Sequence, residues 1–126
     1  MSIPSEPPVF DYQTLQQLHE LVDDGDASFL RELFESYLQC AEESIELLKD
    51  GRDYEAVRRA AHSLTGSSLN VGAVSVAQIA RQLELELTAR QVANLTAQVG
   101  RLEAQLKRVV ENYPDAIANL TARASA

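Results

Sequence analysis

The residue best suited to chemistry in this sequence is His62. It stands in the segment 58–72, RRAAHSLTGSSLNVG, whose composition is otherwise mostly that of a helix. A neutral imidazole is a good nucleophile toward phosphorus near pH 7, because the pKa of a free histidine side chain is about 6.5. It can accept a phosphoryl group and later return it, and such transfer needs mainly positioning and charge stabilisation from the protein.

Polar and cationic residues surround His62 at helical spacing. Arg58 and Arg59 precede it by four and three residues, and Thr65 follows it by three. Residues three and four apart are neighbours on a helix surface, so these side chains are expected beside the imidazole. The arginines and the hydroxyl of Ser67 could then partly neutralise phosphoryl oxygens. The alternative, that both arginines are merely solvated charges, stays open.

Gly66 lies one turn after His62 on the same face. Glycine inside a helix costs about 1 kcal/mol relative to alanine, so its presence needs a reason. Either another helix passes very close, or a partner must reach the imidazole. We favour access for a partner, and we expect Ser68, near the apolar stripe, to be structural.

Other chemistries find little support in the sequence. The only other histidine, His19, has no metal-ligand spacing and is expected to be a surface or boundary residue. A single cysteine, Cys40, excludes an internal disulfide and a cysteine-based metal cluster, and it fits a reducing cytoplasm. The formal net charge of −8 disfavours nucleic acid and anionic membranes as partners. No apolar run approaches the roughly 20 residues needed to span a bilayer.

Capping residues divide the first half of the chain into two helices. Asp11 is a candidate N-cap for a short helix that ends at Gly25. Asp26 can cap the next helix, which Gly51 closes. One apolar stripe runs along this second helix: Leu30, Leu33, Phe34, Tyr37, Ala41, Ile45 and Leu48.

Three further helices are expected after Gly51. Asp53 caps the one that carries His62, which ends near Asn70, and Gly72 turns the chain into the next. The last helix has the clearest pattern, an apolar seam with alternating steps of three and four residues from Val92 to Tyr113. Pro114 should interrupt or kink it. In the helix that carries His62 the inward positions are Val57, Ala60, Ala61, Leu64 and Ser68. In the helix that follows Gly72 they are Val76, Ile79, Ala80, Leu83 and Leu87.

These elements predict an all-α protein, an antiparallel up-down four-helix bundle with a short additional N-terminal helix. Residues 1–10, with three prolines, are expected to form a flexible leader. The bundle then occupies residues 11–113. Residues 114–126 form a C-terminal extension that could continue as a frayed helix.

The segment around His62 resembles the histidine-containing phosphotransfer (Hpt) domains of two-component phosphorelays. The match lies in residues 61–68, AHSLTGSS, followed by Gly72, close to the family's His-x-Leu-Lys-Gly-Ser-Ser and downstream glycine. Asp11, the turn before Phe29 and the pair Leu83-Glu84 support it. The resemblance covers residues 11–113, nearly the whole bundle.

The resemblance implies that His62 is phosphorylated at Nε2 and exchanges the group with an aspartate of a receiver domain. That receiver belongs to a response regulator or a hybrid sensor kinase. Mg²⁺ and the acid chemistry belong to the receiver, so this chain is expected to need no cofactor and no metal. It would be a phosphocarrier without independent turnover, with Gly66 at the close-approach position and Ser67 near the phosphoryl group. From the composition and the apolar stripes we expect a cytoplasmic monomer.

Two positions depart from the family pattern. The lysine three residues after the histidine is Thr65 here, and we expect Arg58 to be the main electrostatic substitute. The frequent glutamine of the following helix aligns with Glu84, a carboxylate that would hydrogen-bond neutral or protonated His62 and repel a phosphohistidine. Thr65 keeps open a second function, a degenerate bundle that acts as a binding or inhibitory module. A generic structural or metal-binding bundle would explain the fold and leave the His62 motif unexplained.

Overall fold

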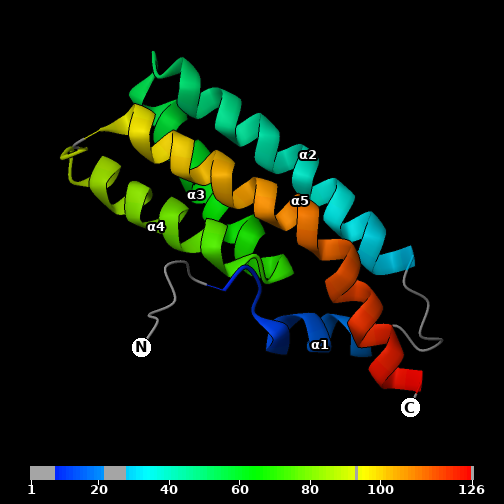
Figure 1. Cartoon of the computed structure of the whole chain (residues 1–126). Coiled ribbons are helices and arrows are strands. Elements are labelled where there is room, and N and C mark those ends of the chain that lie inside the picture. Colours follow the sequence, from blue (N-terminus) through cyan, green and yellow to red (C-terminus); the bar gives the residue numbers. More distant parts are fainter. Residues whose placement is uncertain (1–7, 22–27, 93, 126) are drawn as a thin grey trace, which may run out of the picture.

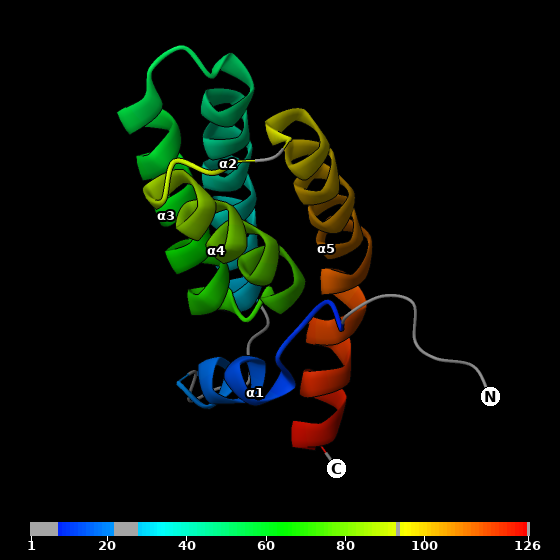
Figure 2. The same cartoon turned by 90° about the vertical axis from the view of Figure 1, so that its left-hand side faces the viewer.

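The computed structural model describes residues 8–21, 28–92 and 94–125, and this part of the chain contains helices and no strand. The helices are α1 (Tyr12–Glu20), α2 (Ser28–Asp50), α3 (Tyr54–Val71), α4 (Val74–Thr88) and α5 (Leu95–Ser125). Figures 1 and 2 show α2 to α5 side by side, with α1 across the end of the bundle where α3 passes into α4. The predicted bundle with an extra N-terminal helix is confirmed.

The helix ends follow the capping residues. The side chain of Asp11 accepts a hydrogen bond from the Gln13 N–H at the start of α1, and Asp53 caps α3 in the same way. Gly51 and Gly72 have φ angles of +63° and +75°, the left-handed conformation that ends many helices at glycine. These four predicted ends are confirmed. The predicted roles of Gly25 and Asp26 lie outside the described residues.

The core forms from the inward stripes of all the helices. In α3 and α4 every predicted inward position is buried. Burial of apolar surface contributes about 25 cal/mol per Å², so these stripes supply the main force that fixes each helix's rotation about its axis. A fixed rotation also determines which side chains face outward, and it turns His62 toward solvent.

The turn between α3 and α4 is tied to the start of α1. The N–H of Asp11 donates to the carbonyl of Gly72 at 2.8 Å. A Cβ added to Gly72 would lie 3.1 Å from the Asp11 carbonyl oxygen and 3.2 Å from Thr14 Cβ. Both the turn and the close approach of α1 therefore require glycine here.

The chain ends differ from the expectation at two places. Phe10, placed in a flexible leader, is 3% exposed and belongs to the core, while residues 1–7 lie outside the described residues. At the other end α5 continues through Pro114 to Ser125, so the C-terminal extension is helical, one of the two expected outcomes. Its axis changes direction in that region (Figure 1). Ala116, Ile117 and Leu120 are buried in the same core, so the packing extends past residue 113.

None of the described helices is both long enough and apolar enough to cross a membrane.

Candidate functional site on the outer face of α3

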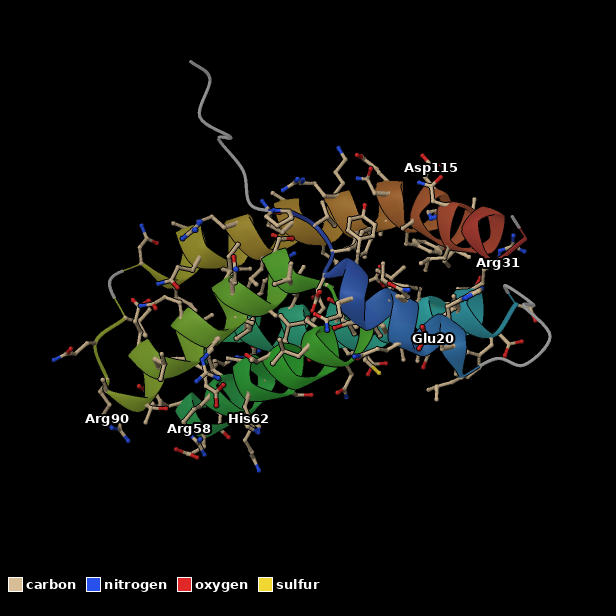
Figure 3. The ribbon with its side chains drawn as sticks, turned by 90° about the horizontal axis from the view of Figure 1, so that it is seen from below. Glu20, Arg31, Arg58, His62, Arg90 and Asp115 are labelled. Atoms are coloured by element: carbon tan, nitrogen blue, oxygen red, sulfur yellow. The ribbon has the colours of Figure 1, made fainter. Side chains whose placement is uncertain are left out.

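His62 projects from the side of α3 that faces away from the core. Its side chain is 73% exposed, and Figure 3 shows it pointing outward from the bundle. Ala61 and Leu64, on either side of it in sequence, are fully buried and hold this part of α3 against its neighbours. The imidazole is thus an accessible group on a firmly packed helix.

Glu84 of α4 holds the imidazole by one of its two nitrogens. Its Oε2 lies 2.6 Å from His62 Nδ1, and the Glu84 side chain is only 21% exposed. A carboxylate can only accept a hydrogen bond, so Nδ1 carries the hydrogen and donates it. The neutral ring then keeps its lone pair at Nε2, the nitrogen that the carboxylate does not contact. The expected hydrogen bond between Glu84 and His62 is confirmed.

Arg58 lies one turn before His62 and is paired with Glu55. Its Nη2 donates to Glu55 Oε2 at 3.0 Å, and the Arg58 side chain is 35% exposed. The hydrogen bond and charge of Glu55 raise the pKa of Arg58, and the charge of Glu84 adds to this in the same direction. The guanidinium therefore lies within electrostatic reach of the carboxylate that holds His62.

Arg59 faces another side of α3. Its Nε donates to the carbonyl of Glu55 at 3.4 Å. Arg59 also lines a hollow between α2 and α3 with Cys40 and Ser63. The structure thus brings Arg58, but not Arg59, to the face of His62.

The two hydroxyl residues predicted near the phosphoryl site are engaged within α3. Thr65, expected at the surface beside the imidazole, is instead 5% exposed and donates to the Ala61 carbonyl at 2.8 Å. Ser67 is partly buried and donates to the carbonyl of Leu64 at 3.3 Å. Neither residue presents a hydroxyl hydrogen toward the imidazole in this conformation.

Gly66 is exposed and lies beside open space. Within the described residues, no atom outside its own helical turn comes within 4 Å of a Cβ added there. Close packing of another helix, one of the two explanations for this glycine, therefore finds no support, and access for a partner remains. Ser68 is fully buried and bonded to the Tyr37 hydroxyl at 2.7 Å, which confirms its structural role.

The sequence interpretation missed two residues near this face. Arg90, just after α4, has its guanidinium carbon 4.4 Å from the centre of the Tyr54 ring at the start of α3. In an up-down bundle the end of one helix lies beside the start of the helix before it. That rule could have paired these two residues from sequence alone.

In the described part of the chain no group of three or more histidine, cysteine, aspartate or glutamate side chains converges. His19, in the last turn of α1, is partly buried. Its Nε2 is shielded from solvent, with no hydrogen-bond partner among the described residues.

Comparison with known proteins identifies relatives of this arrangement. The family model for the Hpt domain matches residues 13–116. Among solved structures, the chain is similar to the crystal structure of histidine-containing phosphotransfer protein B (HptB) from Pseudomonas aeruginosa PAO1. The TM-score is 0.76 at 24% sequence identity, over 90% of this chain and 98% of that one. This likeness shows a shared fold. A search of curated proteins finds no match.

Proposed function

The chain belongs to the Hpt domain family, the phosphotransfer modules of two-component signalling, and on that premise we propose that His62 is its phosphorylated residue. In this proposal His62 exchanges a phosphoryl group with an aspartate of a receiver domain, and the chain acts as a phosphocarrier. The observation that carries the proposal is the exposed imidazole held through Nδ1 by Glu84, which leaves Nε2 as the nucleophile.

The transfer step balances with the groups present. The Nε2 lone pair of His62 attacks phosphorus, the N–P bond forms, and the P–O bond to the receiver aspartate breaks. The aspartate leaves as a carboxylate, and no proton has to move, because Nδ1 keeps its hydrogen. The ring gains positive charge as Nε2 gives up its lone pair, and the Glu84 carboxylate at 2.6 Å offsets that charge.

This geometry changes the expected effect of Glu84. A carboxylate beside the phosphoryl oxygens would repel them, but Glu84 contacts the Nδ1 side of the ring. We therefore propose that Glu84 is a positioning residue that fixes the tautomer and stabilises the phosphorylated ring. Mg²⁺ is proposed to remain on the receiver, where the aspartate is.

Arg58 is the proposed source of positive charge in place of the family lysine. Thr65 supplies none, since it is neutral and its hydroxyl bonds the Ala61 carbonyl. The guanidinium of Arg58 is one turn from His62 and partly exposed, so a phosphoryl group on Nε2 could compete with Glu55 for it. Arg58→Ala is expected to slow transfer about tenfold, because a charge-assisted hydrogen bond contributes roughly 1.5 kcal/mol. An unchanged rate would contradict this role.

A second function remains in view because of Thr65. With no cation three residues after the histidine, the same bundle could bind receivers without accepting phosphate and so act as an inhibitory module. The two functions differ in a single observable, covalent label on His62.

Incubation with a receiver domain charged by labelled acetyl phosphate separates these functions. The wild type is expected to acquire label that is labile to acid and stable to alkali, as expected for a phosphoramidate, and His62→Gln is expected to acquire none. His19→Gln is the matched control and should label like the wild type. Binding of the receiver without label on the wild type would support the inhibitory module instead.

A further inference from the structure

The two ends of the outer face of α3 carry different kinds of side chain. Tyr54 and Arg58 precede His62 by two turns and one turn, while Gly66 and Leu69 follow it. Leu69 is 52% exposed and adds apolar surface at its end of this face. Steps of three and four residues make these positions one continuous surface. A partner that covers His62 meets an aromatic and cationic end on one side and an open, apolar end on the other.

Arg90, just after α4, extends the cationic end. Its φ angle is +56°, a left-handed conformation that is unfavourable for any residue with a Cβ. Its guanidinium carbon lies 4.4 Å from the centre of the Tyr54 ring, and the Tyr54 hydroxyl donates to the Leu87 carbonyl of α4. The ring is thus fixed to α4, and the guanidinium is held over it at a defined place.

The charge around this end differs from that of the chain as a whole. The formal net charge of the chain is −8. Near the start of α3, however, the pKa of Glu55 is lowered, mainly by its hydrogen bond and charge interaction with Arg58 and further by Arg59 and Arg90. Three arginines, two on α3 and one just after α4, therefore act on this carboxylate. Figure 3 shows Arg90, Arg58 and His62 along the same side of the molecule.

We propose that Arg90, stacked on Tyr54, is a docking residue that contacts a carboxylate on the receiver domain covering His62. The inference rests on the proposed function, since it assumes a receiver as the partner. The aspartyl phosphate of such a partner is itself anionic, so the cationic end attracts the side of the receiver that carries it. The apolar end at Leu69 then fixes which way round the receiver lies.

A docking charge of this kind acts on association rather than on the chemical step. Charges at the rim of an interface chiefly change the association rate and its dependence on salt. Arg90→Glu is expected to lower the second-order rate constant of transfer about tenfold at roughly 20 mM salt. At about 0.5 M salt screening should remove most of that difference. The first-order rate of transfer inside the complex should stay unchanged.

The test measures phosphoryl transfer by rapid quench over a range of concentrations of a phosphorylated receiver domain, at low and high salt. Binding of the unphosphorylated receiver is measured in parallel by calorimetry. Arg31→Glu is the matched control, because Arg31 is an exposed arginine that lies at the opposite end of the molecule (Figure 3). Arg90→Gly removes the charge while relieving the backbone, which guards against misfolding of the glutamate variant.

The outcomes separate this proposal from the proposed function. A salt-dependent loss of association for Arg90→Glu and Arg90→Gly, larger than for Arg31→Glu, supports docking. The proposal is overturned if Arg90→Glu and Arg31→Glu lose association equally, or if the first-order transfer step of the Arg90 variants is slower. It is also overturned if the wild type binds no receiver. If the wild type binds receivers without acquiring label, transfer fails as a function. The Arg90 proposal is then decided by the binding data alone.

Discussion

The two faces of α3 come from the same short motif and follow opposite structural rules. On the outer face His62 is 73% exposed, and the space beside Gly66 is filled by none of the described residues. On the inner face Ser68 is fully buried and hydrogen-bonded to Tyr37 of α2. Gly72, at the end of the helix, is in close contact with α1. The outer face is accessible to a partner, and the inner face is packed against the rest of the protein.

The contrast indicates that chemistry and stability are separable along one helix. Substitution of an exposed side chain away from caps and the core usually changes the free energy of unfolding little. Loss of a buried contact lowers it several times more. Substitutions on the outer face should therefore change transfer and leave unfolding almost unaltered. Substitutions on the inner face and at the turn should do the reverse, and the two groups of variants test this separation.

The largest effect on stability is expected at Gly72. Gly72→Ala should lower the free energy of unfolding by about 3 kcal/mol, because it combines left-handed strain with a methyl group pressed against α1. The added Cβ would lie 3.1 Å from the Asp11 carbonyl oxygen, closer than ordinary van der Waals contact. Urea unfolding followed by circular dichroism measures the loss. Transfer per folded molecule should not change.

Gly51→Ala is the control for the Gly72 variant. Gly51 also has a positive φ angle, +63°, but its nearest neighbours would lie 3.8 Å from an added Cβ, an ordinary contact distance. Gly51→Ala should therefore lower the free energy of unfolding only by the left-handed strain, about 1 to 2 kcal/mol. Equal losses at the two glycines would mean that the approach of α1 contributes nothing, and the turn would no longer count as close-packed.

Next in size is the effect of a large side chain at Gly66. Gly66→Leu should lower the rate of phosphoryl transfer at least tenfold, since the leucine occupies space that a receiver must fill to reach the imidazole. Stability should be retained or rise by up to about 1 kcal/mol, because glycine is a poor helix residue. Transfer kinetics and urea unfolding on the same preparation give both values.

Gly100 offers a matched control for this substitution. It lies within α5, and a Cβ added there also meets no described atom within 4 Å. Gly100→Leu should therefore have the same effect on stability and none on transfer. If both leucine variants transferred at the wild-type rate, the outer face of α3 would not be the contact surface for the receiver.

A smaller effect is expected from the hydrogen bond between Tyr37 and Ser68. Tyr37→Phe should lower the free energy of unfolding by about 1 to 2 kcal/mol at pH 7, because the buried Ser68 hydroxyl loses its partner. Transfer by the folded protein should remain at the wild-type rate, since Tyr37 of α2 and Ser68 of α3 both lie in the core, away from the outer face of α3. Slower transfer would show that the two faces are coupled.

The same pair predicts a dependence on alkaline pH. Burial raises the pKa of Tyr37 to about 12, against a smaller opposite effect of the hydrogen bond to Ser68. The unfolded chain loses this proton near pH 10 and the folded protein only near pH 12, so the stability contributed by Tyr37 is complete below pH 10. It should fall by roughly 2 to 3 kcal/mol as the pH rises from 10 to 12. The difference between wild type and Tyr37→Phe in urea unfolding over that range isolates this contribution.

Much of the fold could be predicted because it depends on patterns within single helices. Capping aspartates, terminal glycines and apolar stripes each act over one to four residues, so Asp53, Gly72 and the inward face of α3 followed directly from spacing. The extent of the core could not be predicted in this way. Phe10 is buried because the segment before α1 packs on the bundle, which no helical pattern encodes. Ile117 is buried because α5 runs on through Pro114, a residue that was expected to end the bundle.

The site shows the same division between local and long-range information. Helical spacing predicted which residues lie near His62, but not where their side chains form hydrogen bonds. The Thr65 hydroxyl donates a hydrogen bond to the Ala61 carbonyl of its own helix. Helical spacing alone does not distinguish this from a hydroxyl that faces the imidazole. The contact of Glu84 with His62 depends on the register of α4 against α3, which the family resemblance supplied. Arg90 belongs to no motif, so only the up-down order of α3 and α4 could have pointed to its contact with Tyr54.

The smallest predicted effect tests why Gly66 is a glycine at all. Gly66→Ala should raise the free energy of unfolding by about 0.5 to 1 kcal/mol, and Gly100→Ala should raise it equally, since both positions lie in helix interiors beside open space. Transfer should stay within about twofold, because one methyl group is small against a docked surface. Thermal and urea unfolding together resolve such a gain. If alanine stabilises the fold at position 66, folding does not require the glycine, and the space beside it is available to a partner. If alanine destabilises instead, the outer face is packed after all, and the contrast between the two faces of α3 fails.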